Sequence, residues 1–159
     1  MKAGDIVKLI ISIALPLAAG ALGNIATMPA IPTWYQGLNK PTFNPPRGLF
    51  GPAWILLYIL MGITLFFVWR KGFNKPGVKL ALLVFLIQLV LNVIWSFLFF
   101  GLRSPLAGLI EIVVLWLAIL FTLILFFRVS VPAGILLLPY LGWVTFATIL
   151  NAAIVTMNS

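Results

Sequence analysis

Residues 105–127 read PLAGLIEIVVLWLAILFTLILFF, an almost unbroken apolar run with one charged side chain, Glu111. About 20 apolar residues in a helix cross the hydrocarbon core of a bilayer, which is about 30 Å thick. Four more segments have this character, at residues 6–28, 49–69, 80–102 and 131–155. A backbone inside lipid must satisfy its own hydrogen bonds, and these runs lack the alternation of a membrane β-barrel, so we expect five transmembrane helices.

The composition of the whole chain also indicates a membrane protein. Of its 159 residues, 64% are hydrophobic and 8% are charged, and the mean hydropathy is +1.23. Soluble domains are typically about 45–50% apolar and about 25% charged, so an ordinary soluble domain is excluded, and so is a disordered chain. The chain has no cysteine and no histidine, which excludes disulfides, thiolate catalysis, histidine acid–base chemistry and the usual zinc, copper and haem-iron ligands.

We therefore expect residues 1–159 to form a single domain, an all-α bundle of five transmembrane helices. An alternative concerns the first segment, where Lys2 and Lys8, an apolar run and the sequence AGA at residues 19–21 resemble a secretory signal with its cleavage site. The apolar run continues to Met28, which is too long for a signal peptide, so we favour an uncleaved helix.

The distribution of lysine and arginine predicts the orientation of the chain. Five spans put the termini on opposite sides, and the amino-terminal side collects Lys2, Lys8, Arg70, Lys71, Lys75, Lys79 and Arg128. The other side collects Lys40, Arg47 and Arg103. Positive charge in short loops favours the cytoplasm, so we expect an integral protein of a bacterial cell membrane with a cytoplasmic amino terminus and an exported carboxyl terminus. The net charge of +8 is divided between two membrane surfaces, where it meets lipid headgroups, and indicates no nucleic-acid partner.

The longest connector, residues 29–48, reads PAIPTWYQGLNKPTFNPPRG and contains five prolines. Proline fixes φ and removes a backbone donor, so this segment is a stiff, non-helical loop. Because Trp34, Tyr35, Leu38 and Phe43 also make it apolar, we expect it to fold onto the helix bundle as a lid. The alternative, which composition leaves open, is that its aromatic side chains only sit at the membrane interface.

Four of the six tryptophans, Trp54, Trp95, Trp116 and Trp143, lie inside the predicted spans, whereas interface belts would put them at the ends. Most of them fall in the exported half. Tyr58 lies one helical turn from Trp54 on the same face. Any one of these rings could simply fill a gap between helices, but the set together favours a shared cavity.

A polar stripe runs along the third segment. Gln88, Asn92 and Ser96 recur at i, i+4 and i+8, with Trp95 beside them. Polar side chains that face lipid are costly, so the stripe should face the inside of the bundle. It can serve either as interhelical hydrogen bonding or as ligand contact, and the pattern favours neither.

Glu111 is the only acidic residue inside a predicted span, because the other acidic residue, Asp5, lies just before the first span. A charge within the membrane is a functional candidate by default. Arg103 lies two turns earlier, across a tight connector, and we expect a structural Arg103–Glu111 ion pair. A proton relay would need further titratable groups, and the chain has no histidine to supply one.

Four motifs resemble one protein family in their residues and their order. They are W-Y-x-x-L-x-K-P-x-F-x-P-P at residues 34–46, G-P-A-W-x-x-L-Y-x-L-M-G at 51–62, Q-L-x-L-N-x-x-W-S-x-x-F-F-G at 88–101 and P-Y-L-x-W-V-x-F-A-T-x-L-N at 139–151. The chain resembles the translocator protein family, also called tryptophan-rich sensory proteins and, in animals, peripheral-type benzodiazepine receptors. The resemblance covers nearly the whole chain.

The resemblance implies a five-helix bundle, usually a homodimer, with a pocket under the first loop. Family members bind porphyrins such as protoporphyrin IX, sterols and synthetic benzodiazepine-site ligands. The positions that match the family's pocket are Asn24, Phe50, Ala53, Trp54, Asn92, Trp95, Trp143, Ala147 and Leu150. Some bacterial relatives degrade protoporphyrin in light, a reaction attributed to tryptophans that match Trp54 and Trp143. The animal sterol motif needs tyrosine and arginine where this chain has Ala152 and Thr156, and animal members carry tryptophan where it has Ala107.

A porphyrin is a flat apolar disc with two carboxylates, and tryptophan faces offer it stacking and burial. Tyr58, Gln88 and Asn92 could orient it, and Lys40 and Arg47 in the loop could meet its propionates. We expect no metal site and no obligatory cofactor, with protoporphyrin IX or haem as a ligand. Three functions follow as hypotheses, namely a tetrapyrrole-binding sensor, a light- and oxygen-dependent porphyrin-degrading enzyme, and a transporter of porphyrin or sterol.

Overall fold

Five long helices make up most of the computed structural model, which describes residues 2–159 except for the side chain of residue 47. They are α1 (Ala3–Ala30), α2 (Arg47–Trp69), α3 (Val78–Ser96), α4 (Pro105–Val129) and α5 (Val131–Met157). A 3-10 turn, η1 (Tyr35–Gly37), lies in the first loop, and η2 (Phe97–Gly101) continues α3 with wider, π-type turns. Each long helix has the length and apolar composition to cross a membrane. The expected all-α class and the five long apolar helices are confirmed.

Serine and proline set the start of the last two helices. The Ser104 hydroxyl oxygen accepts a hydrogen bond from the backbone N–H of Ala107 at 3.1 Å, and α4 begins directly after it with Pro105. Ser130 accepts in the same way from the N–H of Ala133 at 3.5 Å. Proline suits the first turn of a helix because its missing N–H would be unpaired there anyway. Since Ser130 alone separates α4 from α5, the two helices form a tight antiparallel hairpin.

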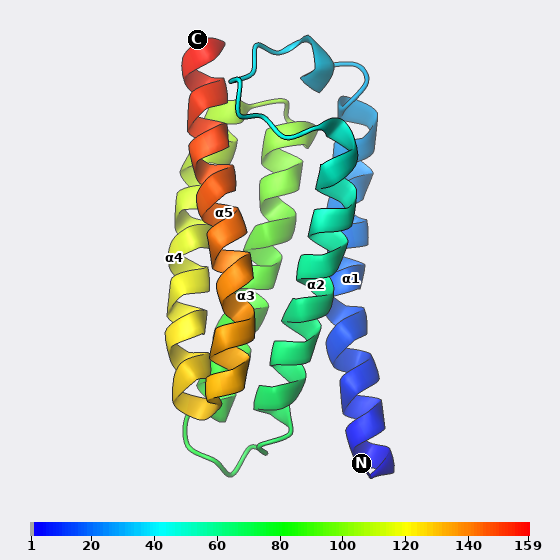
Figure 1. Cartoon of the computed structure of the whole chain (residues 1–159), viewed down its shortest axis with the longest axis vertical. Helices are drawn as coiled ribbons and strands as arrows, with labels where there is room; N and C mark the ends of the chain where they lie inside the picture. Colours follow the sequence, from blue (N-terminus) through cyan, green and yellow to red (C-terminus); the bar gives the residue numbers. More distant parts are fainter. Residues whose placement is uncertain (1) are drawn as a thin grey trace.

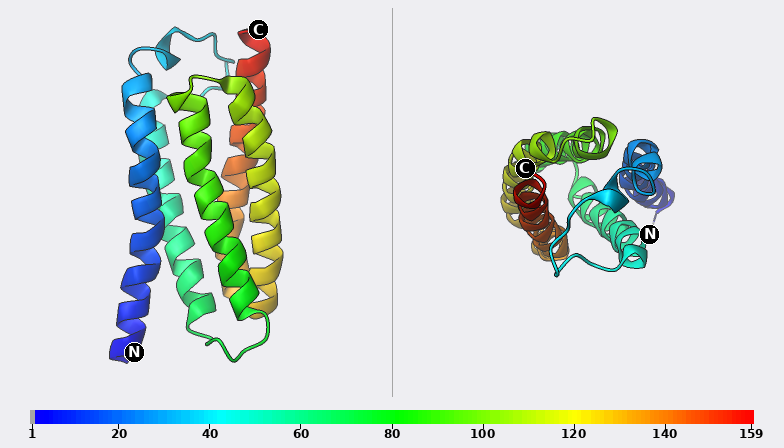
Figure 2. Two further views of the ribbon diagram at one scale, coloured as in Figure 1. Left: turned by 180° about the vertical axis from the view of Figure 1, so that it is seen from behind. Right: turned by 90° about the horizontal axis from the view of Figure 1, so that it is seen from above.

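The helices form a closed ring when seen along the bundle axis. α1 packs against α2 and α3, α4 packs against α3 and α5, and α2 packs against α5. The order around the ring is therefore α1, α2, α5, α4, α3 (Figure 2). The two termini lie at opposite ends of the bundle, and the first loop crosses the end that holds the carboxyl terminus (Figure 1). We call this the loop end and the other the amino-terminal end.

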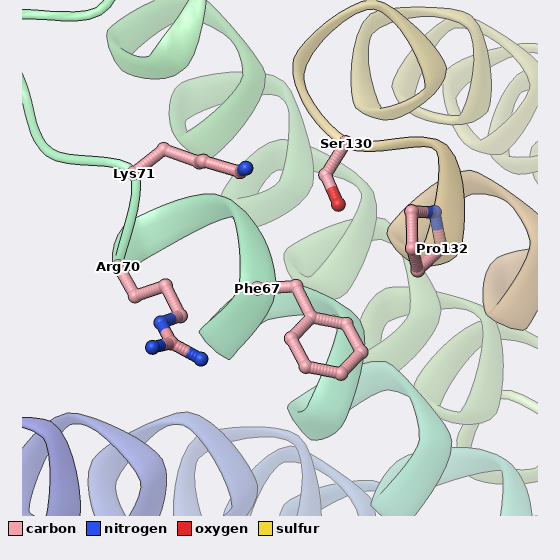
Figure 3. A pocket seen from close by; sticks show the side chains of 5 residues that line it. All are labelled: Phe67, Arg70, Lys71, Ser130 and Pro132. Atoms are coloured by element: carbon pink, nitrogen blue, oxygen red, sulfur yellow. The ribbon is translucent and has the colours of Figure 1, made fainter. Parts of the chain in front are cut away.

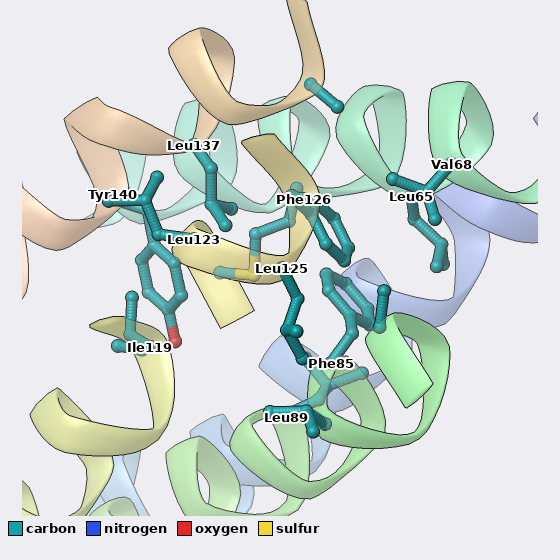
Figure 4. Close-up of a cluster of buried hydrophobic side chains, with 14 of the residues drawn as sticks. Leu65, Val68, Phe85, Leu89, Ile119, Leu123, Leu125, Phe126, Leu137 and Tyr140 are labelled. Atoms are coloured by element: carbon teal, nitrogen blue, oxygen red, sulfur yellow. The ribbon is translucent and has the colours of Figure 1, made fainter. Parts of the chain in front are cut away.

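The main core occupies the middle of the bundle and its amino-terminal end. Phe85 stacks on Phe126 with ring centroids 5.7 Å apart, and both side chains are fully buried (Figure 4). α1 and α2 approach each other closely at Gly62, where an added Cβ would lie 2.5 Å from the Cα of Ile13. Small residues at such crossings let helix backbones pack tightly in a membrane.

A second, aromatic cluster lies at the loop end. Phe99 and Ile154 are buried at its centre. The loop packs onto it through Trp34, whose ring lies 5.6 Å from that of Phe99, and through Tyr35, whose ring lies 5.5 Å from that of Phe100. The first loop therefore rests on the ends of the helices through its own aromatic side chains.

Candidate functional site

A groove lies between α2 and α5 at the loop end, directly under the second half of the first loop. Its volume is about 470 Å³. It is lined by Pro45, Leu49, Ala53, Leu56, Leu57, Pro139, Gly142, Trp143 and Phe146. All nine are apolar apart from the indole N–H, and Leu56 and Gly142 are exposed on the outer face of the bundle. We call this hollow the tryptophan groove. It contains two residues expected from the sequence, Ala53 and Trp143.

Trp54 and Trp143 meet at this groove. Their rings lie 6.3 Å apart at an interplanar angle of 86°, an edge-to-face contact between α2 and α5. Phe50 lies 6.1 Å from the Trp143 ring on one side, and Phe146 lies 5.7 Å from it on another. The indole Nε1 of Trp143 is buried and has no hydrogen-bond partner among the described residues. A buried donor without a partner is unusual, and this N–H could meet a ligand acceptor only if the Trp143 side chain or its neighbours moved.

Trp95 belongs to a different aromatic group. Its ring stacks on Phe99 with centroids 5.0 Å apart, and its indole N–H donates to the Asn151 side-chain oxygen at 3.1 Å. The Asn151 amide in turn donates to the carbonyl of Pro105 at 2.9 Å, which ties α3, α4 and α5 together. The ring contacts join Trp54 to Trp143, whereas Trp95 makes its ring contacts with Phe99 and Phe100. The tryptophans thus form two groups.

The polar stripe of α3 is built into a hydrogen-bond chain across the bundle. The Tyr58 hydroxyl donates to the Asn92 side-chain oxygen at 3.0 Å, and the Asn92 amide donates to the Tyr140 hydroxyl at 2.8 Å. The Tyr140 hydroxyl then donates to the Gln88 side-chain oxygen at 2.8 Å. Tyr58 comes from α2 and Tyr140 from α5, the two helices that are not next to α3 in the ring, so the stripe does form interhelical hydrogen bonds. Tyr58 also stacks on Trp54 at 5.6 Å, which links this chain to the tryptophan groove.

Tyr140 is the central residue that the expected ligand contacts left out. It is 1% exposed and bonds to both polar side chains of the α3 stripe. The sequence signal was its position directly after Pro139, inside an apolar span. Pro45, Leu49 and Gly142 also line the tryptophan groove without having been expected there.

The remaining expected contacts are spread over the loop end. Asn24 is exposed on α1, Leu150 is buried in the aromatic cluster, and Ala147 packs against the main core. These three do not line the tryptophan groove.

Lys40 is folded back into its own loop. Its ammonium group donates to the carbonyls of Tyr35 and Leu38 at 3.0 and 3.1 Å and lies 4.9 Å over the Tyr35 ring. Burial of Tyr35 raises the pKa of its hydroxyl above the usual value. The other expected propionate contact, Arg47, starts α2, but its side chain lies outside the described residues. Lys40 would have to leave these carbonyls to meet a propionate.

The loop is also tied to the end of α5. The backbone N–H of Asn39 donates to the Asn158 side-chain oxygen at 3.0 Å, and the Asn158 amide donates back to the Asn39 carbonyl at 2.9 Å. We call this reciprocal pair the loop latch. It fixes the loop at a point between η1 and the segment that covers the tryptophan groove.

The expected Arg103–Glu111 ion pair is not formed. Both carboxylate oxygens of Glu111 are buried without a hydrogen-bond partner among the described residues. Arg103 is exposed and has a φ of 52°, a left-handed turn that is rare outside glycine. This turn breaks the helical register between η2 and α4, so counting turns from Arg103 to Glu111 does not predict where the arginine side chain lies.

The motifs and the fold agree with a comparison to known protein families. The model of the TspO/MBR family matches residues 12–157, almost the entire chain. The chain belongs to the TspO/MBR family.

TspO/MBR relatives from distant organisms match along most of their length. The chain is 49% identical to the tryptophan-rich protein TspO of Archaeoglobus fulgidus over 156 residues, which is 98% of this chain and 99% of the relative. It is 46% identical to the protein of the same name in Chlorobaculum tepidum, over 97% of this chain and 98% of the relative. It is 37% identical to the translocator protein of Bos taurus, over 86% of this chain and 82% of the relative. With its five spans, this TspO/MBR chain is an integral membrane protein.

Proposed function

We propose that this TspO/MBR protein binds a flat apolar tetrapyrrole, such as protoporphyrin IX or haem, in the tryptophan groove. The observation that carries the proposal is an apolar groove of about 470 Å³ lined by Trp143, whose ring is packed edge-to-face against Trp54 and Phe50. Ligand pockets of proteins are typically about 300–1,000 Å³, mostly apolar, with a few placed polar groups. This groove has the size and the composition of such a pocket.

Aromatic side chains supply the interaction surface. Trp143 and Phe146 line the groove, and Trp54 lies edge-on behind Trp143. Rings in offset or edge-to-face contact attract beyond their simple burial, so a porphyrin face can pack against this group as another aromatic ring would. Pro45 from the loop covers the groove, and we propose that residues 29–48 act as its lid.

The propionates of the ligand point toward the membrane surface in this arrangement. The loop carries Lys40 and Arg47 at this end of the bundle, and either cation can pair with a carboxylate. Because Lys40 is bonded to loop carbonyls, its use requires a rearrangement of η1. We also propose that the loop end faces the exported side, since the opposite end carries more lysine and arginine.

The test fills the groove without touching an aromatic side chain. Gly142 lines the groove, and a Cβ built on it meets nothing within 4 Å. A Gly142→Leu variant should fold normally and lose quenching of tryptophan fluorescence by protoporphyrin IX. Gly51→Leu is the matched control, because Gly51 is also open but does not line the groove. Equal quenching in both variants would place the ligand elsewhere.

A light-dependent degradation of the bound porphyrin is a second candidate function. The observation that favours it is the stack of Tyr58 on Trp54 at 5.6 Å, with Trp54 in contact with Trp143. Dioxygen is the oxidant in this reaction and the porphyrin ring is oxidised, while Trp143 lines the groove and Trp54 contacts Trp143. Loss of the porphyrin absorption band in light and air should depend on Trp54 and Trp143. Equal bleaching of free porphyrin without protein would dismiss this function.

A further inference from the structure

A second hollow lies between α2 and α5 at the amino-terminal end, far from the tryptophan groove. Its volume is about 320 Å³. It is lined by Phe67, Arg70, Lys71, Ser130 and Pro132, as Figure 3 shows. Arg70 and Lys71 follow the last residue of α2, and Ser130 and Pro132 come from the turn between α4 and α5. We call this hollow the basic groove.

The two cations of the basic groove have no counter-charge. Both side chains are exposed, and neither forms an ion pair or a hydrogen bond among the described residues. The Arg70 guanidinium lies 5.6 Å over the Phe66 ring, which holds it beside the groove. The two acidic residues of the chain are Asp5, near the start of α1, and Glu111, toward the loop end of α4. Neither is paired with Arg70 or Lys71, so the groove can take an anion.

Backbone and side-chain contacts hold the basic groove in shape. The Lys75 ammonium group donates to the Val129 carbonyl at 2.9 Å, which fixes the connector after α2 against the end of α4. Gly72 makes the turn that this connector needs, with a φ of 88°. Ser130 directly precedes α5, and its side-chain oxygen accepts a hydrogen bond from the N–H of Ala133, which fixes the start of this helix beside the groove. The cations therefore face a preformed hollow.

The surroundings of the groove are those of a lipid headgroup. The groove lies where α2 ends and α5 begins, which is the level at which the chain leaves the hydrocarbon core. Phe67 and Pro132 give it an apolar wall. On α5, Val131 and Ile135 are 57% and 52% exposed and continue this apolar surface toward the middle of the bundle. An amphiphile with an anionic head and an acyl chain matches both the cationic groove and the apolar surface beside it.

We infer that the basic groove binds the phosphate headgroup of an anionic phospholipid from the surrounding bilayer. Arg70 and Lys71 pair with the phosphate oxygens, Ser130 offers a hydroxyl, and the acyl chain lies against α5. Charge-assisted hydrogen bonds from arginine and lysine suit phosphate. Because two cations face the groove without an acid, a headgroup with net negative charge binds better than a zwitterionic one.

The test measures lipid binding by the full chain in neutral detergent. Native mass spectrometry counts bound phosphatidylglycerol, with phosphatidylcholine as the zwitterionic comparison. The wild type should bind one phosphatidylglycerol in preference to phosphatidylcholine, and an Arg70→Gln/Lys71→Gln variant should bind it about tenfold more weakly. Lys2→Gln/Lys79→Gln is the matched control, because both lysines are exposed and lie outside the groove. This control should stay close to the wild type.

Three results would overturn the inference. Equal weakening in the control would mean that overall charge, not the basic groove, attracts the lipid. Equal binding of phosphatidylcholine would mean that the groove does not select an anion. Complete displacement of phosphatidylglycerol by the same concentration of inorganic phosphate would identify the ligand as free phosphate. Protoporphyrin quenching should be unchanged in the Arg70→Gln/Lys71→Gln variant, so this test stands apart from the proposed tetrapyrrole site.

Discussion

The two ends of the bundle are built differently. At the amino-terminal end, α1 and α2 touch at Gly62 and the Phe85–Phe126 stack fills the centre. At the loop end, the groove between α2 and α5 is larger, about 470 Å³ against about 320 Å³ for the basic groove, and the buried indole N–H of Trp143 has no partner among the described residues. Tight packing gives stability, and incomplete packing gives room for a ligand. The comparison teaches that stability and binding can be changed separately in this protein.

Gly62→Ala should have the largest effect on stability. The added Cβ would lie 2.5 Å from the Cα of Ile13 and 2.7 Å from the Ser12 carbonyl oxygen, so the two helices must move apart. Overpacking of this kind costs about 1–3 kcal/mol. Thermal unfolding in detergent measures the loss. Gly51→Ala is the control, since its Cβ meets nothing within 4 Å. Equal stability of the two variants would contradict the proposed difference between the ends.

Tyr140→Phe tests the hydrogen-bond chain that crosses the bundle. The change removes a buried hydroxyl that bonds to both Asn92 and Gln88. Unsatisfied buried polar groups cost about 1–3 kcal/mol each, although membrane proteins show smaller values. We expect a loss of about 1 kcal/mol in the free energy of unfolding. Tyr58→Phe, which removes one bond of the same chain, should lose less. A larger loss in Tyr58→Phe would reverse this order.

Glu111→Gln should leave stability unchanged or raise it. The carboxylate is buried and neither oxygen has a partner among the described residues, so a neutral amide of the same shape removes a charge that none of them compensates. Breaking a buried ion pair would instead cost about 3–5 kcal/mol. Chemical unfolding of Glu111→Gln and of Arg103→Gln separates the two cases. A large loss of unfolding free energy in both variants would mean that Arg103 and Glu111 form an ion pair after all.

Asn158→Ala should have a small effect on stability and a clear effect on ligand exchange. It removes the reciprocal bonds to Asn39 that form the loop latch, and these bonds are exposed. A hydrogen bond typically contributes about 0.5–1.5 kcal/mol to the free energy of unfolding, and exposed bonds lie at the low end of this range. Stopped-flow quenching should show faster dissociation of protoporphyrin IX, with little change in the unfolding temperature. Unchanged dissociation would mean that the loop latch does not hold the lid.

The helices were predictable because their signal is length and composition. An apolar run such as residues 105–127 has few alternatives to a helix in lipid. The partners of a polar residue were harder to predict, because they depend on which faces meet. Gln88 and Asn92 could be placed on one face of α3, but their choice of Tyr140 depends on the rotation of α5.

Two site expectations show the limit of spacing arguments. Trp95 was grouped with Trp54 and Trp143 by its depth and by the family resemblance, and neither says which neighbour a ring faces. It bonds to Asn151 and stacks on Phe99. The Arg103–Glu111 pair assumed a regular helix through a connector that contains a left-handed residue. Local backbone geometry of this kind is not encoded in apolar periodicity.

The tryptophan groove opens sideways, toward the lipid, so the concentration that decides its occupancy is that of the ligand in the membrane. Leu56 and Gly142 line it and are exposed on the flank of the bundle, at a depth where acyl chains surround the protein. An apolar molecule arrives there by dissolving in the lipid phase first and then diffusing within it. Occupancy therefore follows the mole fraction of the molecule among the lipids. The same protein titrated in twice as much detergent or lipid should show a weaker apparent affinity without any change in the groove.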